Sequence, residues 1–365
     1  MDRQLAPDWF SKPADSIRLL MQRRGITVAE LARSLENGID TFRAIYDGTR
    51  AIDEKIARIL SNQLGGSSDF WLSRQKHFET ALDRVVDVAR QESDAWLNLV
   101  PSPNGRRPAK KLSEERLRQE LRQRLIFFGV SKLDAWERRY GSALGATRFR
   151  TSKSYTSSVD SLLLWLRRGE IEAELTSTRP WNPENLRDRI DELRKLTTIS
   201  SPRRFLPKLR SLLAAAGVAL VVVKAPPGCR ASGAARMVSP DKAMLLMSFR
   251  HRADDQFWFT LFHEIGHLLL HHGTTCVDGD DLPTSQQIET EANDFASFCL
   301  IPIHRTEELE ELPPSSSSVI RFSVSVGISP GITVGQMQYR KIIGYDRLNH
   351  LKRRWSWEDI EPALV

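Results

Sequence analysis

Apolar residues in the first 80 positions recur three or four apart over short stretches, which predicts a bundle of short helices. Thr27, followed three residues later by Glu30, has the pattern of a capping box and predicts the start of the second helix. That helix, a turn at Asn37-Gly38 and a third helix from about Asp40 predict a helix-turn-helix. The apolar positions are Ile17, Leu20, Met21, Val28, Leu31, Ala32, Leu35, Phe42, Ile45, Ile56, Ile59 and Leu60.

Beyond the middle of the chain the pattern changes from helical to strand-like. Short apolar runs separated by turn residues predict a small sheet. Helical patterns precede and follow these runs, so we expect a mainly α protein with a small β-sheet, an α+β fold. The serine-rich stretch 313–318 is predicted to be a loop. The helical patterns cover 113–127, 159–176, 184–196, 203–216, about 255–272 and about 284–300, and the apolar runs cover 218–223, 231–238 and 243–249.

The composition is that of an ordinary soluble protein, with 41% hydrophobic and 27% charged residues. No apolar run approaches the roughly 20 residues that a membrane span needs, and the first residues lack the pattern of a secretion signal. The cysteines, Cys229, Cys276 and Cys299, are odd in number and far apart, which suits reduced thiols better than disulfides. We therefore expect a cytoplasmic protein that does not contact a membrane.

The net charge of +7 is unevenly distributed. Residues 101–150 hold 13 Lys and Arg against 5 Asp and Glu, whereas residues 1–80 hold 12 against 11. A basic segment of this kind can follow the phosphates of a nucleic acid, and a solvated basic helix has the same pattern. Both interpretations are open at this point.

The most specific motif is His263-Glu264-Ile265-Gly266-His267, an HExxH sequence inside a helical pattern. A spacing of four residues places both histidines on one helix face, about 5–6 Å apart at Cβ, so both imidazoles can reach one zinc ion. Glu264 lies beside that face, where it can accept a proton from the attacking water. Buried histidines in an apolar helix would be costly without such a partner.

A catalytic zinc ion takes three protein ligands, so one more is needed. The candidates in the following helix are Glu289, Glu291 and Asp294. Glu289 shares its helix face with small residues that allow a close approach, so we rank it first, Glu291 second and Asp294 third. His271 is either a group at the rim of the site or a histidine at a helix end. The residue that stabilises the transition state is undecided among Arg250, His271, His304 and Tyr339.

Four segments together resemble the ImmA/IrrE family of bacterial metallo-endopeptidases: WLRRGEIEAE, FWFTLFHEIGHLLLHH, IETEANDFASFCLIP and GISPGITVGQMQY. The resemblance implies a zincin-like domain in which His263, His267 and Glu289 bind zinc. It also implies that a repressor-like regulatory protein is the substrate, in a stress, mobile-element or toxin–antitoxin setting.

Residues 13–80 are similar to the Cro/C1-type (XRE) helix-turn-helix of plasmid-maintenance antidote proteins, through DSIRLLMQRRGITVAELARSL, AIYDGTRAIDEKIARIL and DFWLSRQ. This similarity implies DNA binding through the third helix, and a homodimer is compatible with it. Phosphate contacts are expected from Thr49 and Arg50, and base contacts from Asp40, Thr41 and Arg43.

The best linker candidate is the stretch 101–111, which holds Pro, Gly and charge without periodicity. We place the main boundary there. Around it we expect a helix-turn-helix domain at 1–80, a basic helical region at 81–158, a zinc metallopeptidase-like domain at 159–310 and a C-terminal region at 311–365 that packs on or extends that domain.

Two functions fit these features. The first is a zinc-dependent HExxH endopeptidase coupled to a DNA-binding module. The alternative is an antitoxin-like transcriptional regulator whose metalloprotease-like half senses a signal and does not cut. The presence of Glu264 favours the enzyme, because a structural zinc site needs no general base there.

Overall fold

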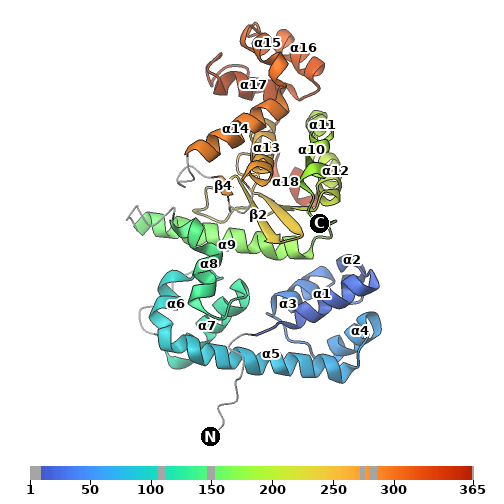
Figure 1. Ribbon diagram of the computed structural model, residues 1–365, viewed down its shortest axis with the longest axis vertical. Coiled ribbons are helices and arrows are strands. Elements are labelled where there is room, and N and C mark those ends of the chain that lie inside the picture. The colour runs from blue at the N-terminus through green and yellow to red at the C-terminus, as the bar shows by residue number, and fades with distance from the viewer. Residues whose placement is uncertain (1–9, 106–111, 146–152, 272–275, 279–285, 364–365) are drawn as a thin grey trace. The chain divides into compact units, whose positions relative to one another are not determined.

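A computed structural model describes residues 10–105, 112–145, 153–271, 276–278 and 286–363 (Figure 1). The chain divides into two compact units, Met1–Gly141 and Ser142–Val365. The first unit is helical in its described part, and the second combines helices with a four-stranded sheet. The expected class, mainly α with a small β-sheet, is confirmed.

The first unit contains eight α-helices in its described residues, with the last one reaching just past the unit's end. Thr27 caps α2 as predicted: its hydroxyl accepts from the Glu30 backbone N–H at 3.3 Å, and Glu30 accepts from the Thr27 backbone N–H at 2.7 Å. Asn37 and Gly38 both have positive φ in the turn before α3. The helices are α1 Pro13–Arg24, α2 Val28–Arg33, α3 Ile39–Asp47, α4 Glu54–Leu64, α5 Ser68–Ala89, α6 Ser93–Leu99, α7 Glu114–Phe128 and α8 Leu133–Gly145.

The basic helix α7 packs along α5, and its arginines face acidic residues. Arg122 Nη1 lies 2.6 Å from Asp83 Oδ1, and Arg118 forms an ion pair with Asp87. Arg124 is buried and donates to the Val100 carbonyl at 2.9 Å. The basic segment therefore contains a helix whose arginines bind acidic residues of its own unit. This favours a structural role for these arginines over contacts with the phosphates of a nucleic acid. Of the proposed linker 101–111, residues 106–111 lie outside the described residues.

Contacts that Lys12 and Gly48 make with α7 agree with a first unit that extends to Gly141. Lys12 Nζ donates to the Ile126 carbonyl at 2.7 Å and to the Asp47 carbonyl at 3.2 Å. A Cβ on Gly48 would meet Ile126 at 3.4 Å. The stretch 101–111 therefore connects helices of one unit, and the boundary between the compact units falls later than the sequence suggested.

The second unit surrounds its sheet with helices of very different lengths (Figure 1). The two long helices expected around the HExxH motif are present, and so are the three predicted strands; a fourth, short strand was not predicted. Its elements are α9 Lys153–Leu175, α10 Pro183–Asp188, α11 Ile190–Lys195, α12 Pro202–Ala215, β1 Val218–Val222, β2 Gly233–Ser239, β3 Lys242–Met247, α13 Asp254–Leu270, β4 Cys276–Asp278, α14 Gln286–Leu300, α15 Thr306–Glu310, α16 Ser316–Val326, α17 Pro330–Tyr339 and α18 Trp357–Ile360.

The strand order is β1-β3-β2-β4. β1 runs parallel to β3, with Val218 opposite Ala243, and β2 is antiparallel to both β3 and β4. Gly233, the first residue of β2, pairs with Met247 on one side and Asp278 on the other. The start of β2 is thus flanked on both sides, and its backbone position is fixed.

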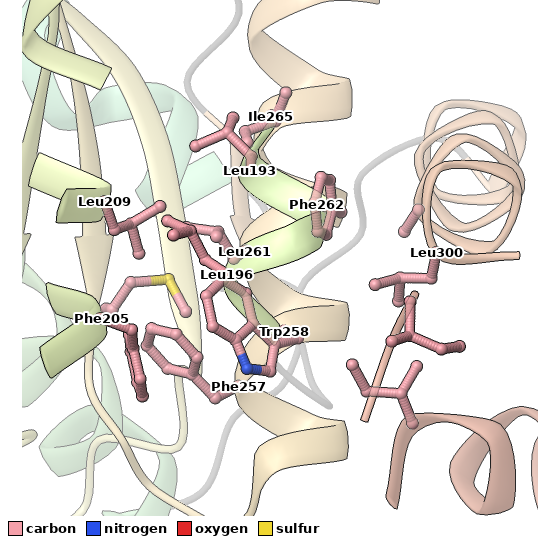
Figure 2. Packing of buried hydrophobic residues seen from close by; sticks show 14 of the residues in the cluster. Leu193, Leu196, Phe205, Leu209, Phe257, Trp258, Leu261, Phe262, Ile265 and Leu300 are labelled. Atoms are coloured by element: carbon pink, nitrogen blue, oxygen red, sulfur yellow. The ribbon is translucent and has the colours of Figure 1, made fainter. Parts of the chain in front are cut away.

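Helix α13 is buried along almost its whole length, which explains why its sequence is apolar on every face. Trp258, Leu261 and Phe262 pack among residues of α11, α12 and α14 (Figure 2). The rings of Trp258 and Phe205 have centroids 5.0 Å apart. Truncation of such a side chain costs about 3–5 kcal/mol. The core therefore fixes the helix that carries the HExxH motif.

The loop predicted at 313–318 is wrong in its second half, because α16 begins at Ser316. The hydroxyl of Ser315 accepts from the backbone N–H of Ser318 at 3.2 Å and caps the helix. Burial of Val319 and Phe322 stabilises it despite weak helix formers. The helix ends at Gly327, whose φ is 80°. The serine-rich composition predicted a loop, but one of these serines, Ser315, caps the helix.

Within the described residues, no single helix has the length and apolar character that a bilayer crossing requires. The pair α16 and α17 reaches that length and composition only together, and the two helices are bent by 108° at their junction.

Candidate metal centre

His263 and His267 lie one turn apart on α13, and their side chains converge. Only 3% of His263 and 1% of His267 is exposed. Their Nε2 atoms are 2.9 Å apart, so one ion could contact both. The spacing of the HExxH motif therefore has the geometric consequence that the sequence predicted.

The third group comes from α14. Glu289 places Oε2 3.3 Å from His263 Nε2 and Oε1 3.6 Å from His267 Nε2. Ligand atoms of the three residues all lie within 4.8 Å of one another. Helices α13 and α14 approach closely at Gly266, where a Cβ would lie 3.4 Å from the Ala292 Cα. The small residues that ranked Glu289 first thus lie at the helix crossing.

The other acidic candidates lie elsewhere. Glu291 is directed to His271, with Oε2 3.0 Å from its Nε2. Asp294 is exposed. Neither belongs to the cluster around the two histidines. Among the described acids, only Glu289 joins His263 and His267.

Hydrogen bonds on the far side of each imidazole orient the two histidines. His263 Nδ1 lies 3.0 Å from Asn293 Oδ1, an acceptor, so Nδ1 carries the proton and Nε2 presents its lone pair. His271 Nε2 donates to the Glu291 carboxylate, and His271 Nδ1 therefore accepts from His267 Nδ1 at 3.1 Å. Both Nε2 atoms are left as acceptors toward the centre, the arrangement that metal-binding histidines require.

The electrostatics agree with this assignment. Burial, and next the neighbouring His263, lower the pKa of His267 to about 4, and Glu289 opposes the shift. His267 is therefore neutral at pH 7, which is the form that binds a metal ion. Two imidazoles and a carboxylate form a ligand set for a divalent metal ion.

Glu264 lies beside the cluster and is fully buried. A Cβ placed on Gly233, at the start of β2, would lie 2.7 Å from Glu264 Oε1 and 2.7 Å from Thr260 Cγ2. The carboxylate thus lies against the backbone of the sheet, next to the ligand-bearing face of α13. This is a suitable position for a proton acceptor beside a metal ion.

Residues 221–330 match the family model of the IrrE N-terminal-like domain, Peptidase_M78. This stretch is metallopeptidase-like. It runs from β1 into α17 and includes His263, Glu264, His267 and Glu289. The peptidase part of the resemblance found in the sequence is confirmed, as is the zincin-like class of the domain. No curated protein matched the chain.

Two residues of the metallopeptidase-like domain escaped the sequence analysis. Asn293 follows Glu289 by four residues, a spacing that places it on the same helix face, so a search for a hydrogen-bond partner could have found it. Gly233 is 31 residues before Glu264 and has no signal in the sequence. His271, left open above, acts in the structure as the partner of His267.

Cys229 and Cys299 of this domain are free thiols. Burial raises the pKa of Cys229, and it raises the pKa of Cys299 to about 12. Of the remaining candidates for transition-state stabilisation, Tyr339 and His304 are exposed. The ring of Tyr339 lies 6.1 Å from that of Phe259, whose own ring lies 6.4 Å from His263.

The five residues expected to contact DNA have different surroundings in the first unit. Asp40 and Thr49 are exposed, and Arg43 and Arg50 are half-buried. Thr41 is only 4% exposed, and its hydroxyl accepts from Arg50 Nη1 at 3.0 Å. Thr41 therefore does not face outward from α3, and the expected base contact from it is corrected: it supports Arg50 instead.

Proposed function

We propose that this protein is a zinc-dependent endopeptidase of the cytoplasm, which cleaves a repressor-like regulatory protein and contacts DNA through its first unit. The observation that supports it most is the convergence of His263, His267 and Glu289, with ligand atoms within 4.8 Å of one another, beside a buried Glu264. The match of residues 221–330 to a metallopeptidase domain supports the same class of reaction.

In this proposal His263, His267 and Glu289 are the zinc ligands, and Asn293 and His271 hold the imidazoles in the required tautomer. A bound zinc ion would lower the pKa of a water molecule and polarise the carbonyl group of the scissile peptide bond. Burial of both histidines excludes bulk water, which strengthens electrostatic interactions in the site.

Glu264 is the general base and acid. Its carboxylate accepts a proton from the attacking water and then delivers that proton to the amine that leaves. Gly233 leaves room for the carboxylate because it has no side chain. Glu264 is not one of the three residues of the cluster, so its loss should affect the chemistry and spare the metal.

The test compares zinc-loaded full-length protein with its Glu264→Gln variant on repressor-like proteins. Wild type should give discrete fragments, and the variant should cut about 10²–10⁴-fold more slowly with zinc retained. Glu307→Gln, an exposed glutamate on α15, is the matched control and should cut like wild type. Equal cleavage by Glu264→Gln would overturn the role of Glu264. No cleavage by zinc-loaded wild type would favour the alternative, an antitoxin-like regulator whose metalloprotease-like half does not cut.

A further inference from the structure

Two aromatic side chains, Phe259 and Tyr339, lie next to the candidate metal centre and are called the aromatic pair below. Phe259 precedes His263 by four residues and therefore shares the face of α13 that carries both histidines. Its ring centroid is 6.4 Å from that of His263. The ring of Tyr339, the last residue of α17, is 6.1 Å from that of Phe259. The pair thus extends outward from one of the candidate metal ligands.

Two glycines of α17 set its distance from α13. A Cβ on Gly331 would lie 2.8 Å from Asp254 Oδ2, and a Cβ on Gly335 would lie 2.9 Å from the Cβ of Asp255. Contacts this short leave no room for a side chain at either glycine, so α17 passes directly over the first turn of α13. This close approach carries the end of α17 to the second turn of α13.

The end of α17 presents the ring of Tyr339 beside the site. The helix ends at Tyr339, and Lys341, two residues later, has a φ of 62°, which turns the chain. Phe259, which Tyr339 meets, lies about one helical turn before His263. Helix α17 therefore stops about one turn short of the candidate metal ligands, with an aromatic ring at its tip.

The aromatic pair has apolar surface that the fold leaves uncovered. Tyr339 is 55% exposed, and Phe259 is half-buried against the core of the second unit. A side chain as exposed as Tyr339 adds little to the stability of that core, whereas a ligand that covers it gains from the apolar area that becomes buried. The exposure and the position of the pair together favour contact with a ligand over a role in packing.

The ligand that fits this position is the substrate. In the proposed function the scissile bond lies at the metal ion, beside His263. An extended peptide advances about 3.3–3.6 Å per residue, so the 6.4 Å between the rings of His263 and Phe259 corresponds to about two residues of substrate. A substrate side chain within about two residues of the scissile bond can therefore reach the aromatic pair.

We propose that Phe259 and Tyr339 form a subsite for a large apolar side chain of the substrate close to the scissile bond. The proposal rests on the proposed function and deepens it by adding a substrate preference. Rings of this kind attract an aromatic side chain in stacked or edge-to-face geometry. Arginine also stacks on exposed rings and is the competing ligand. The half-buried Phe259 favours the apolar side chain, because a guanidinium group would lose hydration there.

Binding is measured with three pools of fluorescein-labelled decapeptides whose central residue is Phe, Ala or Arg, with small uncharged residues at the other positions. The zinc-loaded full-length Glu264→Gln variant serves as receptor, because it should bind without cutting. We expect the Phe pool to bind about tenfold more tightly than the Ala pool by fluorescence anisotropy, since a large apolar side chain covers both rings. The Arg pool should bind less tightly than the Phe pool.

Adding Tyr339→Ala to the receptor should remove most of the preference for the Phe pool, and Tyr339→Gln should do the same. Tyr339→Phe should keep it, because the ring makes the contact and the hydroxyl does not. Tyr345→Ala, at an exposed tyrosine of the same unit, is the matched control and should keep the preference. A purely structural role of Tyr339 would weaken binding of the Phe and Ala pools equally, so the ratio of the two affinities separates the two roles.

Three kinds of result would overturn the proposal. The first is no binding of the Phe pool, equal affinity for the Phe and Ala pools, or an unchanged ratio in Tyr339→Ala and Tyr339→Gln. The second is loss of the preference in Tyr339→Phe, which would assign the contact to the hydroxyl. The third is tightest binding by the Arg pool through Tyr339, which would assign the rings to a cationic side chain.

Cleavage by zinc-loaded wild type separates this proposal from the proposed function. If wild type cuts none of the pools while the Phe pool still binds through Tyr339, the peptidase assignment fails and the apolar subsite stands. If wild type cuts the Phe and Ala pools at equal rates, the enzyme stands and the apolar preference is overturned.

Discussion

The backbone of Gly233 lies directly against the carboxylate of Glu264. A Cβ at Gly233 would be 2.7 Å from Glu264 Oε1 and 2.8 Å from its Cγ, which is closer than real Cβ contacts. Two strands flank Gly233, so the backbone cannot retreat, and any side chain at this position must displace the carboxylate.

We therefore expect Gly233→Ala to lower peptidase activity by up to about 10²-fold, because a displacement of about 1 Å at a reacting group has that effect. Zinc content should stay at the wild-type value, since the atoms nearest to that Cβ belong to Glu264 and Thr260 and not to a residue of the cluster. Gly141→Ala is the control, because a Cβ there meets no atom within 4 Å. Wild-type activity in Gly233→Ala would contradict the placement of Glu264 as the base.

The metal content should depend unequally on the three ligands. We expect about one zinc per chain by elemental analysis, with a strong loss in His263→Ala. Glu289→Gln should bind zinc weakly, and excess zinc should restore part of its activity, because an amide is a poorer ligand than a carboxylate. Full zinc occupancy in His263→Ala, or failure of the wild type to take up zinc in a titration, would refute the site.

Asn293 and His271 should set metal affinity without binding the ion. Asn293→Ala removes the acceptor for His263 Nδ1, and Glu291→Gln weakens the hold on His271. Loss of such a partner costs about 10–100-fold in metal affinity. Competition with a zinc chelator measures this directly, and Asp294→Asn, an exposed acid on the same helix, is the control. Equal affinity in Asn293→Ala and Asp294→Asn would show that the tautomer is fixed by other means.

The parts of the site that could be predicted are those that depend on residues close together in the sequence. Two histidines at a spacing of four predict a shared helix face, and the small residues near Glu289 predict a close helix crossing. Gly233 could not be found this way, because its role comes from a contact between a strand and a helix 31 residues later. Thr41 was placed on the wrong face for a different reason. It lies four positions before the apolar Ile45, a spacing that already indicates burial.

In the fold, too, elements defined by nearby residues could be predicted, whereas elements that depend on distant contacts could not. Helices with strong periodicity and caps, such as α2 with Thr27, were predicted closely. The helix α16 was partly missed, because its stability comes from burial of Val319 and Phe322 in the core of the second unit. The stretch 101–111 looked like a boundary by composition, but Lys12 and Ile126, 114 residues apart, join the helices on either side of it.

The first unit gives a separate prediction about DNA. Arg50→Ala should weaken binding to all duplexes, and Arg43→Ala should change the preferred sequence, as expected for phosphate and base contacts. Full-length variants are required, because residues 1–141 form one compact unit that a shorter deletion would break. Arg58→Ala on α4 is the control, since its side chain is 69% exposed. Unchanged binding in the Arg43/Arg50 double variant would make the unit a dimerisation or partner-docking bundle.

The first turn of α13 packs closely against a second glycine, Gly331. A Cβ on Gly331 of α17 would lie 2.8 Å from Asp254 Oδ2, and Asp254 is fully buried, so neither group can move away. Gly331→Ala should lower the free energy of unfolding by about 1–3 kcal/mol, measured by urea denaturation, as overpacking in a core does.

A double-mutant cycle isolates the contact with Asp254. Asp254→Ala is destabilising by itself, because it removes the acceptor for Ser329 Oγ and the Arg353 N–H. In that background the carboxylate is gone, so adding Gly331→Ala should cost much less than it does in the wild type. If the two costs simply add, the destabilisation comes from strain in α17 alone. A clear coupling would instead show that Gly331 is required because α17 must pass close to the acidic first turn of the helix that carries His263 and His267.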